Sequence, residues 1–154
     1  MQEQFLKASY HKGKGILDVT KGDGLLRISD TAKLFGVPPA IYMTGFQPKS
    51  AYSIPSRRGT ECWCFDPSSG QYDNKVIKGG SEIHELKSGT RKKYDLLQAT
   101  IGRGVNERIV FAKDAEDCRG GYCYRFWGVY RLNPNRSTQV HGCVWERIAQ
   151  TVKV

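Results

Sequence analysis

The stretch that decides the fold is GYCYRFWGVYRL, residues 121–132. It is the densest run of β-favouring residues in the chain, and successive side chains of a strand point to opposite sides. One expected face is aromatic and apolar: Tyr122, Tyr124, Phe126, Tyr130 and Leu132. The other carries two arginines beside a tryptophan: Cys123, Arg125, Trp127, Val129 and Arg131. The first face is expected to line a core, and Gly128 to mark a bulge or a close backbone approach.

Strand-like runs recur on both sides of this stretch, with turns between them. The clearest are Thr60–Phe65, Glu107–Ala112 and Val140–Ile148. One short helix is expected over Thr31–Phe35, because a glycine and two prolines follow it. Together they predict a β-dominated fold, all-β with one or two short helices, arranged as an open pseudobarrel of about seven strands.

Two further segments are expected to be strands, Ala40–Phe46 and Tyr94–Ile101, with a short helix as the alternative for the second. The segments Tyr10–Gly24 and Gln47–Gly59 are longer than ordinary hairpin loops. Long loops on a compact barrel usually carry function, so we expect binding residues there.

The length of 154 residues predicts a single domain over residues 1–154. We expect this domain to be a fragment of a larger protein. The net charge of +9 and the pI of about 9.4 favour a polyanionic partner, with nucleic acid ahead of an anionic membrane. The N-terminus lacks the pattern of a secretory signal, which predicts a cytoplasmic protein. No apolar run approaches the length of a membrane span, so we expect no membrane contact. We also expect the isolated domain to be monomeric and to need no cofactor.

The five cysteines have the spacings C-x-C and C-x4-C, which are not those of a standard zinc site. We therefore expect no bound metal, and reduced structural thiols in a cytosolic protein.

Basic and polar side chains gather in the loops, where they can follow a phosphate backbone and read base edges. The sharpest basic cluster follows Gly89 and is expected to lie in a turn. The candidate DNA-binding residues are His11, Lys12, Lys14, Lys21, Asp23, Tyr52, Arg57, Arg58, Tyr72, Asp73, Asn74, Lys75, Lys78, Arg91, Lys92 and Lys93. Double-stranded DNA is the expected partner, with RNA as an alternative.

An enzymatic interpretation rests on Glu85-Leu86-Lys87, the E-x-K pattern of many Mg²⁺-dependent nucleases. Asp66 or Asp73 would be the second carboxylate that such a site needs around the metal. The pattern arises often by chance, so we expect no catalytic residue in this chain and keep a small Mg²⁺-dependent nuclease as an alternative.

The segment Tyr10–Val37 resembles the start of the DNA-binding pseudobarrel found in plant transcription factors and in effector domains of Type IIE restriction endonucleases. That resemblance implies sequence-specific recognition of double-stranded DNA by two loop arms, His11–Gly24 and Tyr72–Lys78. It implies no chemistry for the domain itself, which would be the recognition or effector part of a restriction endonuclease.

The second half of the chain, Arg108–Phe111 followed by Tyr122–Leu132, is similar to the SRA/PUA-like barrels of restriction systems. That resemblance implies a reader of modified bases that turns a base out of the duplex into an aromatic cage. Candidates for the cage are Tyr122, Tyr124, Trp127 and Tyr130, with core packing as the stronger explanation for these residues.

Overall fold

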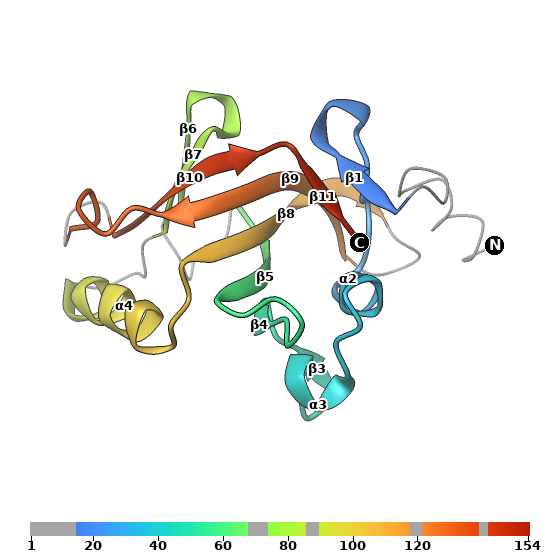
Figure 1. Ribbon diagram of the computed structural model, residues 1–154, viewed down its shortest axis with the longest axis horizontal. Coiled ribbons are helices and arrows are strands. Elements are labelled where there is room, and N and C mark those ends of the chain that lie inside the picture. Colours follow the sequence, from blue (N-terminus) through green and yellow to red (C-terminus); the bar gives the residue numbers. More distant parts are fainter. Residues whose placement is uncertain (1–14, 68–73, 86–89, 118–121, 139–141) are drawn as a thin grey trace.

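The computed structural model describes residues 15–67, 74–85, 90–117, 122–138 and 142–154, and the backbone alone for residues 90–95 and 115–117. Its centre is a seven-stranded sheet in the order β4-β5-β8-β9-β10-β7-β6 (Figure 1). The strands of this sheet are β4 (Ala51–Ser53), β5 (Thr60–Phe65), β6 (Lys75–Ile77), β7 (Glu82–Glu85), β8 (Glu107–Asp117), β9 (Tyr122–Leu132) and β10 (Cys143–Ala149). The sheet is open, with β4 and β6 as its edges, so the expected open, β-dominated pseudobarrel is confirmed.

Two small sheets and three helices complete the described part of the fold. The small sheets pair β1 (Ile16–Asp18) with β11 (Thr151–Lys153), and β2 (Met43–Thr44) with β3 (Gln47–Pro48). The helices are α2 (Ile28–Leu34), α3 (Pro39–Tyr42) and α4 (Thr90–Gly102), with 3-10 turns η2 (Val19–Lys21) and η3 (Lys78–Gly80). In Figure 1, α4 lies below one end of β8 and β9, and α2 and α3 lie towards the other end.

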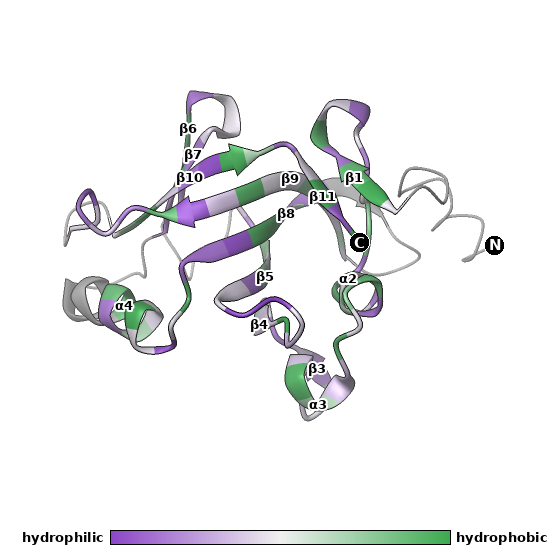
Figure 2. Cartoon of the chain, viewed as in Figure 1, coloured by the Kyte–Doolittle hydropathy of each residue, from purple (hydrophilic) through white to green (hydrophobic). Residues whose placement is uncertain are grey.

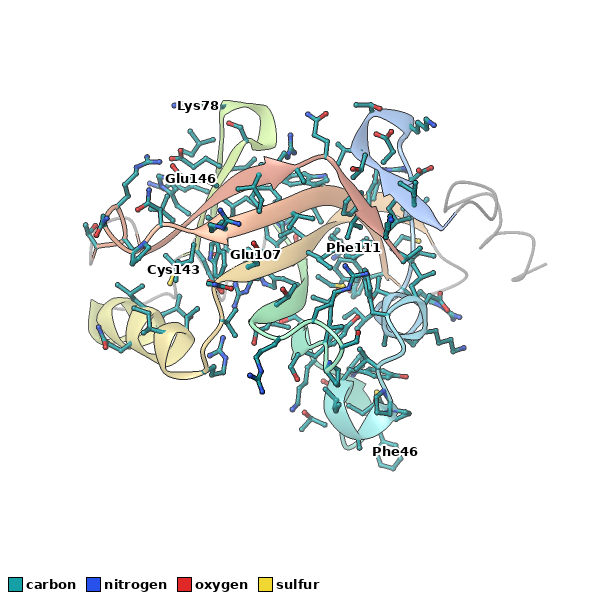
Figure 3. All side chains as sticks on the ribbon, viewed as in Figure 1. Phe46, Lys78, Glu107, Phe111, Cys143 and Glu146 are labelled. Atoms are coloured by element: carbon teal, nitrogen blue, oxygen red, sulfur yellow. The ribbon has the colours of Figure 1, made fainter. Side chains whose placement is uncertain are left out.

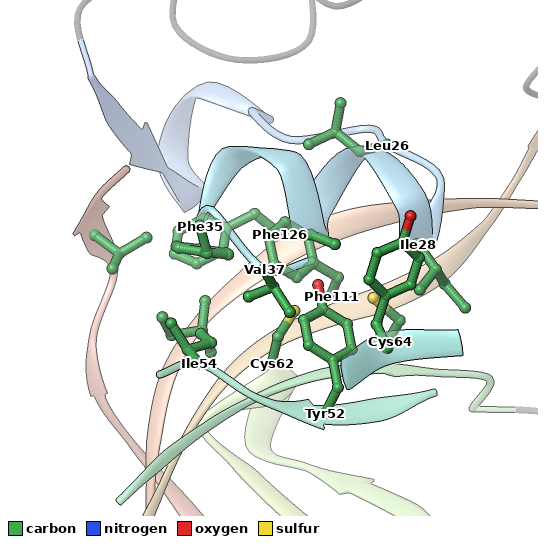
Figure 4. Packing of buried hydrophobic residues seen from close by; sticks show 14 of the residues in the cluster. Leu26, Ile28, Phe35, Val37, Tyr52, Ile54, Cys62, Cys64, Phe111 and Phe126 are labelled. Atoms are coloured by element: carbon green, nitrogen blue, oxygen red, sulfur yellow. The ribbon is translucent and has the colours of Figure 1, made fainter. Parts of the chain in front are cut away.

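Both faces of the main sheet are packed, and alternate residues of β5 divide between two cores. Cys62 and Cys64 belong to the first core, which α2 and α3 cover. Trp63 and Phe65 belong to the second, against which Leu96 of α4 packs. Figure 4 shows the first core, where α2 lies over the side chains of β4, β5 and β8. Figure 2 shows apolar and polar residues intermixed along the central strands, although both faces of the sheet are covered.

Gly128 interrupts β9 as predicted. Its φ is 126°, the pairing with β8 shifts beside it, and a Cβ there would lie 2.7 Å from the carbonyl oxygen of Ala149. The bulge reverses the alternation, because Phe126 and Val129 share the first core whereas Tyr130 lies in the second. The expectation that Phe126 and Tyr130 share one face is therefore wrong, since the extra residue of a bulge shifts the pleat.

Two local predictions are corrected by the structure. Residues expected as the strand Tyr94–Ile101 form most of α4, where Leu96 and Leu97 pack on the second core. The expected strand Ala40–Phe46 begins instead as α3, because Pro39 at the first helical position has its φ already set for a helix. The predicted short helix is confirmed as α2, which begins three residues earlier than expected.

The cysteines follow the prediction in part. Cys62, Cys64 and Cys143 are free and buried. Cys123 is disulfide-bonded, which corrects the expectation of reduced thiols for this residue.

Within the described residues, no group of three or more histidine, cysteine or acidic side chains is placed to hold a metal ion. None of the described helices is long and apolar enough to cross a membrane.

Candidate functional site: a pocket at the open seam of the sheet

A pocket of about 570 Å³ lies where the edge strand β4 and its neighbour β5 come close to β7 and the residue before β6. It therefore sits at the open seam of the barrel. Its lining combines aromatic, acidic and basic side chains: Ile41, Lys49, Ser50, Ala51, Tyr52, Ser53, Glu61, Trp63, Cys64, Phe65, Asp66, Asn74, Glu85, Leu96, Arg103, Arg108 and Tyr124. The volume is in the range of small-ligand sites, and the lining is more polar than is usual for them.

Aromatic side chains from both faces of the sheet line the pocket, Tyr52 and Tyr124 from the first core and Trp63 and Phe65 from the second. Trp63 and Phe65 are two residues apart on β5, so they point to the same face, and their rings stack with centroids 4.6 Å apart. Tyr52 and Tyr124 line the pocket from β4 and β9. Burial raises the pKa of Tyr124 to about 12, so this side chain is a neutral phenol at physiological pH. Trp63 is already stacked by Phe65 and covered by the guanidinium of Arg108, so these two side chains form a rigid wall of the pocket.

A row of alternating charges lies directly against these rings, with the guanidinium of Arg108 4.5 Å from the ring centroid of Trp63. Arg103, just after α4, donates to both carboxylate oxygens of Glu61 at 3.2 and 3.3 Å. Arg108 on β8 donates through Nε to Glu61 at 3.1 Å and through Nη1 to Oε1 of Glu85 at 2.8 Å. Burial by itself lowers the pKa of Arg108, but the carboxylates of Glu85 and Glu61 outweigh burial and raise this pKa above its usual value. The buried guanidinium is therefore charged.

Glu85 presents one oxygen to the pocket. Its Oε1 accepts from Arg108 and also from the indole Nε1 of Trp145, at 3.1 Å. Its Oε2 has no hydrogen-bond partner within the described part of the chain. Because Glu85 lines the pocket, Oε2 is the oxygen left to accept a hydrogen bond from a ligand. The half-buried Asn74 lines the same pocket and adds an amide group.

A short hairpin projects from the pocket. Ile41 and Lys49 both line the pocket, and between them β2 and β3 form the hairpin, closed at its base by a hydrogen bond of 2.6 Å from the backbone N of Lys49 to the carbonyl oxygen of Tyr42. Gly45, with a φ of 60°, takes the first position of the two-residue turn, where hairpins favour glycine. Phe46 takes the second position, and its side chain is 100% exposed (Figure 3).

Several sequence-predicted DNA-binding residues cannot be placed. His11, Lys12, Lys14, Tyr72 and Asp73 lie outside the described residues. Arg91, Lys92 and Lys93 lie in the first turns of α4 rather than in the expected turn, and only their backbone is described.

Four predicted DNA-binding cations are exposed and have no ion-pair partner among the described side chains: Lys21, Arg58, Lys75 and Lys78. An exposed cation of this kind can neutralise a phosphate, and a DNA-binding role for these four residues stays a prediction. Arg57 differs, since it lies over the ring of Phe35 at 5.3 Å and donates to the backbone carbonyl of Lys153.

Two predicted contacts occupy buried positions. Asp23 is buried and accepts a hydrogen bond of 3.0 Å from the backbone N of Asp18, so its carboxylate stabilises the turn after β1. Tyr52 is also buried, with its hydroxyl 2.6 Å from Oγ1 of Thr31. Burial is the largest cause of a raised pKa for this tyrosine. Tyr52 thus lines the pocket rather than an outer surface.

The residues of the E-x-K pattern and of the expected aromatic cage also lie in different places, some in the pocket and others in the core or at the surface. Glu85 is held by Arg108 and Trp145, Asp66 pairs with Lys113 at 3.3 Å, and Lys87 lies outside the described residues. Of the four cage candidates, Tyr124 lines the pocket, Trp127 and Tyr130 pack in or against the second core, and Tyr122 is exposed under the ammonium of Lys113.

Sequence reasoning missed most of the pocket. It did not single out Arg103, Arg108 and Trp145, whose partners lie 23 to 60 residues away in the chain. One signal in the sequence could have indicated the pocket. Glu61 and Arg108 are charged residues inside strand-like runs, where side chains are expected to be buried. A charge at such a position needs a buried partner.

These features define a class: an open β-barrel with an aromatic and acidic pocket at its seam and cations on its surface. The profile of the SRA (SET and RING associated) domain matches residues 11–154, and the chain belongs to this family. SRA domains are DNA-binding reader domains. Of the two resemblances drawn from the sequence, the family match confirms the SRA/PUA-like one.

A search of solved structures agrees with this assignment. The chain is similar to "The 5-Hydroxymethylcytosine-Specific Restriction Enzyme AbaSI", with a TM-score of 0.73 and 19% sequence identity. The similarity covers 99% of this chain and 44% of that one, so the chain spans less than half the length of AbaSI. At this identity the likeness establishes the fold alone. A search of curated proteins finds no match.

Proposed function

We propose that this chain is the DNA-recognition domain of a restriction-type protein, and that it reads a modified base by taking that base out of the duplex into the pocket. The observation that carries the proposal is the pocket itself, which is lined both by aromatic side chains and by Glu85, a carboxylate with one unused oxygen. Membership of the SRA family supports DNA as the partner. The similarity in fold to AbaSI, a 5-hydroxymethylcytosine-specific restriction enzyme, supports cytosine modified at C5 as the base.

The chemistry of the pocket fits such a base. Aromatic rings stack on a flat heterocycle, and each base stacked on an aromatic side chain contributes roughly 1–3 kcal/mol. A carboxylate oxygen accepts from the exocyclic amino group of cytosine, and the amide of Asn74 offers both a donor and an acceptor. The volume of about 570 Å³ leaves room for a substituent on the ring.

The surface around the pocket fits a duplex. Exposed Lys49 lies at the pocket, and Arg58 lies between β4 and β5. Phe46 projects on a hairpin that starts from the pocket lining, and apolar side chains of this kind can enter a base step that has been opened. These features support the proposal: the pocket would receive the extruded base, the cations would contact the backbone, and Phe46 would enter the opened step.

The direct test is binding to duplexes that differ at one position, with cytosine, 5-methylcytosine or 5-hydroxymethylcytosine. We expect a preference for a modified duplex of about tenfold or more, within the range of one extra group in a fitted pocket. A fluorescent 2-aminopurine beside the modified base should brighten on binding as the stack opens. Equal affinity for all three duplexes, with no brightening, would overturn the proposal.

The hairpin offers a matched pair of variants. Phe46→Ala should weaken binding to the modified duplex and reduce the 2-aminopurine signal. Ile148→Ala removes another exposed apolar side chain, on β10, that does not line the pocket, and should leave both readouts unchanged. Selection from a random duplex pool, with and without cytosine modification, tests the two-arm hypothesis in parallel. A consensus sequence that is independent of modification would favour sequence-specific recognition by the two arms instead.

A further inference from the structure

Arg108 occupies an unusual place for a charged side chain. Its guanidinium lies between two indole rings, 4.5 Å from the ring centroid of Trp63 and 4.4 Å from that of Trp145, and the side chain is 3% exposed. The two rings confine the guanidinium plane, while its nitrogens are directed to Glu61 and Glu85. The orientation of Arg108 is therefore fixed by stacking and by ion pairs together.

This arrangement also fixes Glu85. The Oε1 atom receives one hydrogen bond from Arg108 and one from Trp145, both from side chains that are themselves buried. Because two donors hold one oxygen of this carboxylate, the group cannot rotate freely, and the direction of its second oxygen is fixed. Glu61, at the other end of Arg108, is already bonded twice by Arg103, so the arrangement is held at both ends.

We propose that Arg108 is a positioning residue, which fixes Glu85 so that Oε2 accepts the exocyclic amino group of the extruded base and selects an amino-bearing pyrimidine over its keto counterpart. This inference rests on the proposed function. A keto oxygen in place of the amino group would face the carboxylate with no proton between them, so both acceptors would lose a hydrogen bond. A buried polar group left unpaired in this way lowers affinity by roughly 5- to 150-fold.

The orientation of Glu85 decides how strong this selection is. A carboxylate that can rotate away avoids the keto oxygen and loses discrimination, whereas a carboxylate that is held must face it. Lysine at position 108 would keep the positive charge but lacks the planar fork that reaches two carboxylates and stacks between two rings. Arg108→Lys is therefore expected to reduce discrimination more than it reduces affinity for the preferred base.

The experiment compares two duplexes that are identical except for 5-hydroxymethylcytosine or 5-hydroxymethyluracil at one position, each opposite guanine. The mismatched uracil leaves the duplex more easily, so a preference for the cytosine reports the pocket rather than the ease of extrusion. The readout is the ratio of the two dissociation constants. We expect a ratio of about tenfold or more for the wild type, and a ratio near one for Glu85→Gln, whose amide can turn to donate to a keto oxygen.

Two variants test Arg108 itself against a matched control. Arg108→Lys should lower the ratio at least about threefold, and Arg131→Lys should leave it unchanged, because Arg131 pairs with Glu107 on an exposed part of the same sheet. If Arg108→Lys does not fold, Trp145→Phe removes the indole donor to Glu85 while keeping an aromatic ring, and should lower the ratio in the same direction.

The outcomes separate the two proposals. A purely structural Arg108 would weaken binding to both duplexes equally, and an unchanged ratio in folded Arg108→Lys and Trp145→Phe would overturn the inference while the proposed function stands. If the wild type does not distinguish modified from unmodified cytosine, the proposed function itself fails.

Discussion

Strand β7 contributes a glutamate to each of two charge networks that have similar chemistry and different surroundings. Glu85 belongs to the buried network, where it pairs with Arg108 between the two tryptophans. Glu82 belongs to the surface network, where it accepts two hydrogen bonds of 2.8 Å from Arg136. The arginine side chain is 3% exposed in the first network and 45% exposed in the second.

The difference shows which network is suited to recognition. In the surface network Glu82 is also 2.6 Å from His84, and Arg136 also reaches Glu146, so the carboxylate of Glu82 is used on both oxygens. In the buried network Glu85 keeps Oε2 unbonded by any described residue. Oε2 of Glu85 is not among the fully buried unpaired atoms of the described residues, so it remains accessible to a ligand in the pocket.

The largest expected difference between the networks is in stability. Arg108→Met leaves Glu61 and Glu85 buried without their shared cation, and breaking a buried pair in this way costs about 3–5 kcal/mol. Urea unfolding should show this loss in the free energy of unfolding. A loss below about 1 kcal/mol would mean that solvent reaches the buried network.

The next difference is in DNA binding, tested by the same substitution at two positions of β7. Glu85→Gln should weaken binding to a duplex with 5-hydroxymethylcytosine by roughly 1–3 kcal/mol, because its amide competes with the amino-accepting role of Oε2. Glu82→Gln should leave binding unchanged within about 0.5 kcal/mol, because Glu82 does not line the pocket. Equal losses for both variants in a fluorescence anisotropy titration would contradict the assignment of the two networks.

In the surface network, Arg136→Met is the counterpart of Arg108→Met. Its ion pairs are shared with solvent, so we expect a loss of about 1 kcal/mol or less in the free energy of unfolding. Urea unfolding of both methionine variants under the same conditions gives the comparison. A loss as large as that of Arg108→Met would show that exposure does not distinguish the networks.

The smallest expected effect is a loss of folding stability in acid. Hydrogen bonding from Arg136 is the largest cause that lowers the pKa of Glu82, from its usual 4.5 to about 2. Since the folded state lowers this pKa, its stabilisation is complete above pH 4.5 and is lost as the pH falls towards 2. Unfolding measured from about pH 5 down to about pH 2 should show this loss in the wild type, and Arg136→Met should reduce it. If Arg136→Met has the same pH profile as the wild type, the Glu82–Arg136 pair does not cause the loss of stability in acid.

Much of the fold follows from local sequence. The bounds of β9 were predicted at Tyr122–Leu132, because its aromatic residues strongly favour strands and a turn follows it. The bulge at Gly128 was also predicted, but its consequence was not, since the phase of the pleat after a bulge depends on the partner strand. For Tyr94–Ile101 the sequence favours a strand over the alternative short helix because few apolar residues mark a helical period, and packing of Leu96 on the second core decides for the helix α4.

The pocket follows from the sequence far less. The sequence singles out Glu85 as part of the E-x-K pattern with Lys87, two positions away. Its partners in the structure are Arg108 and Trp145, which are 23 and 60 residues away in the chain. Tyr124 was among the expected cage residues, but Trp63 and Phe65 were seen only as members of a strand. Pairing of β5 with the parallel strand β8, and of β7 with β10, brings these residues together, and no local pattern reports such pairing.

The central claim is that an extruded, modified base enters the pocket beside Glu85. The most direct measurement is the crystal structure of this chain bound to a duplex that contains one 5-hydroxymethylcytosine. The account predicts that the modified base lies in the pocket, that its ring stacks on aromatic lining residues, and that its amino group is within hydrogen-bond distance of Oε2 of Glu85. A modified base that stays stacked in the duplex, with the pocket free of nucleic acid, would contradict it.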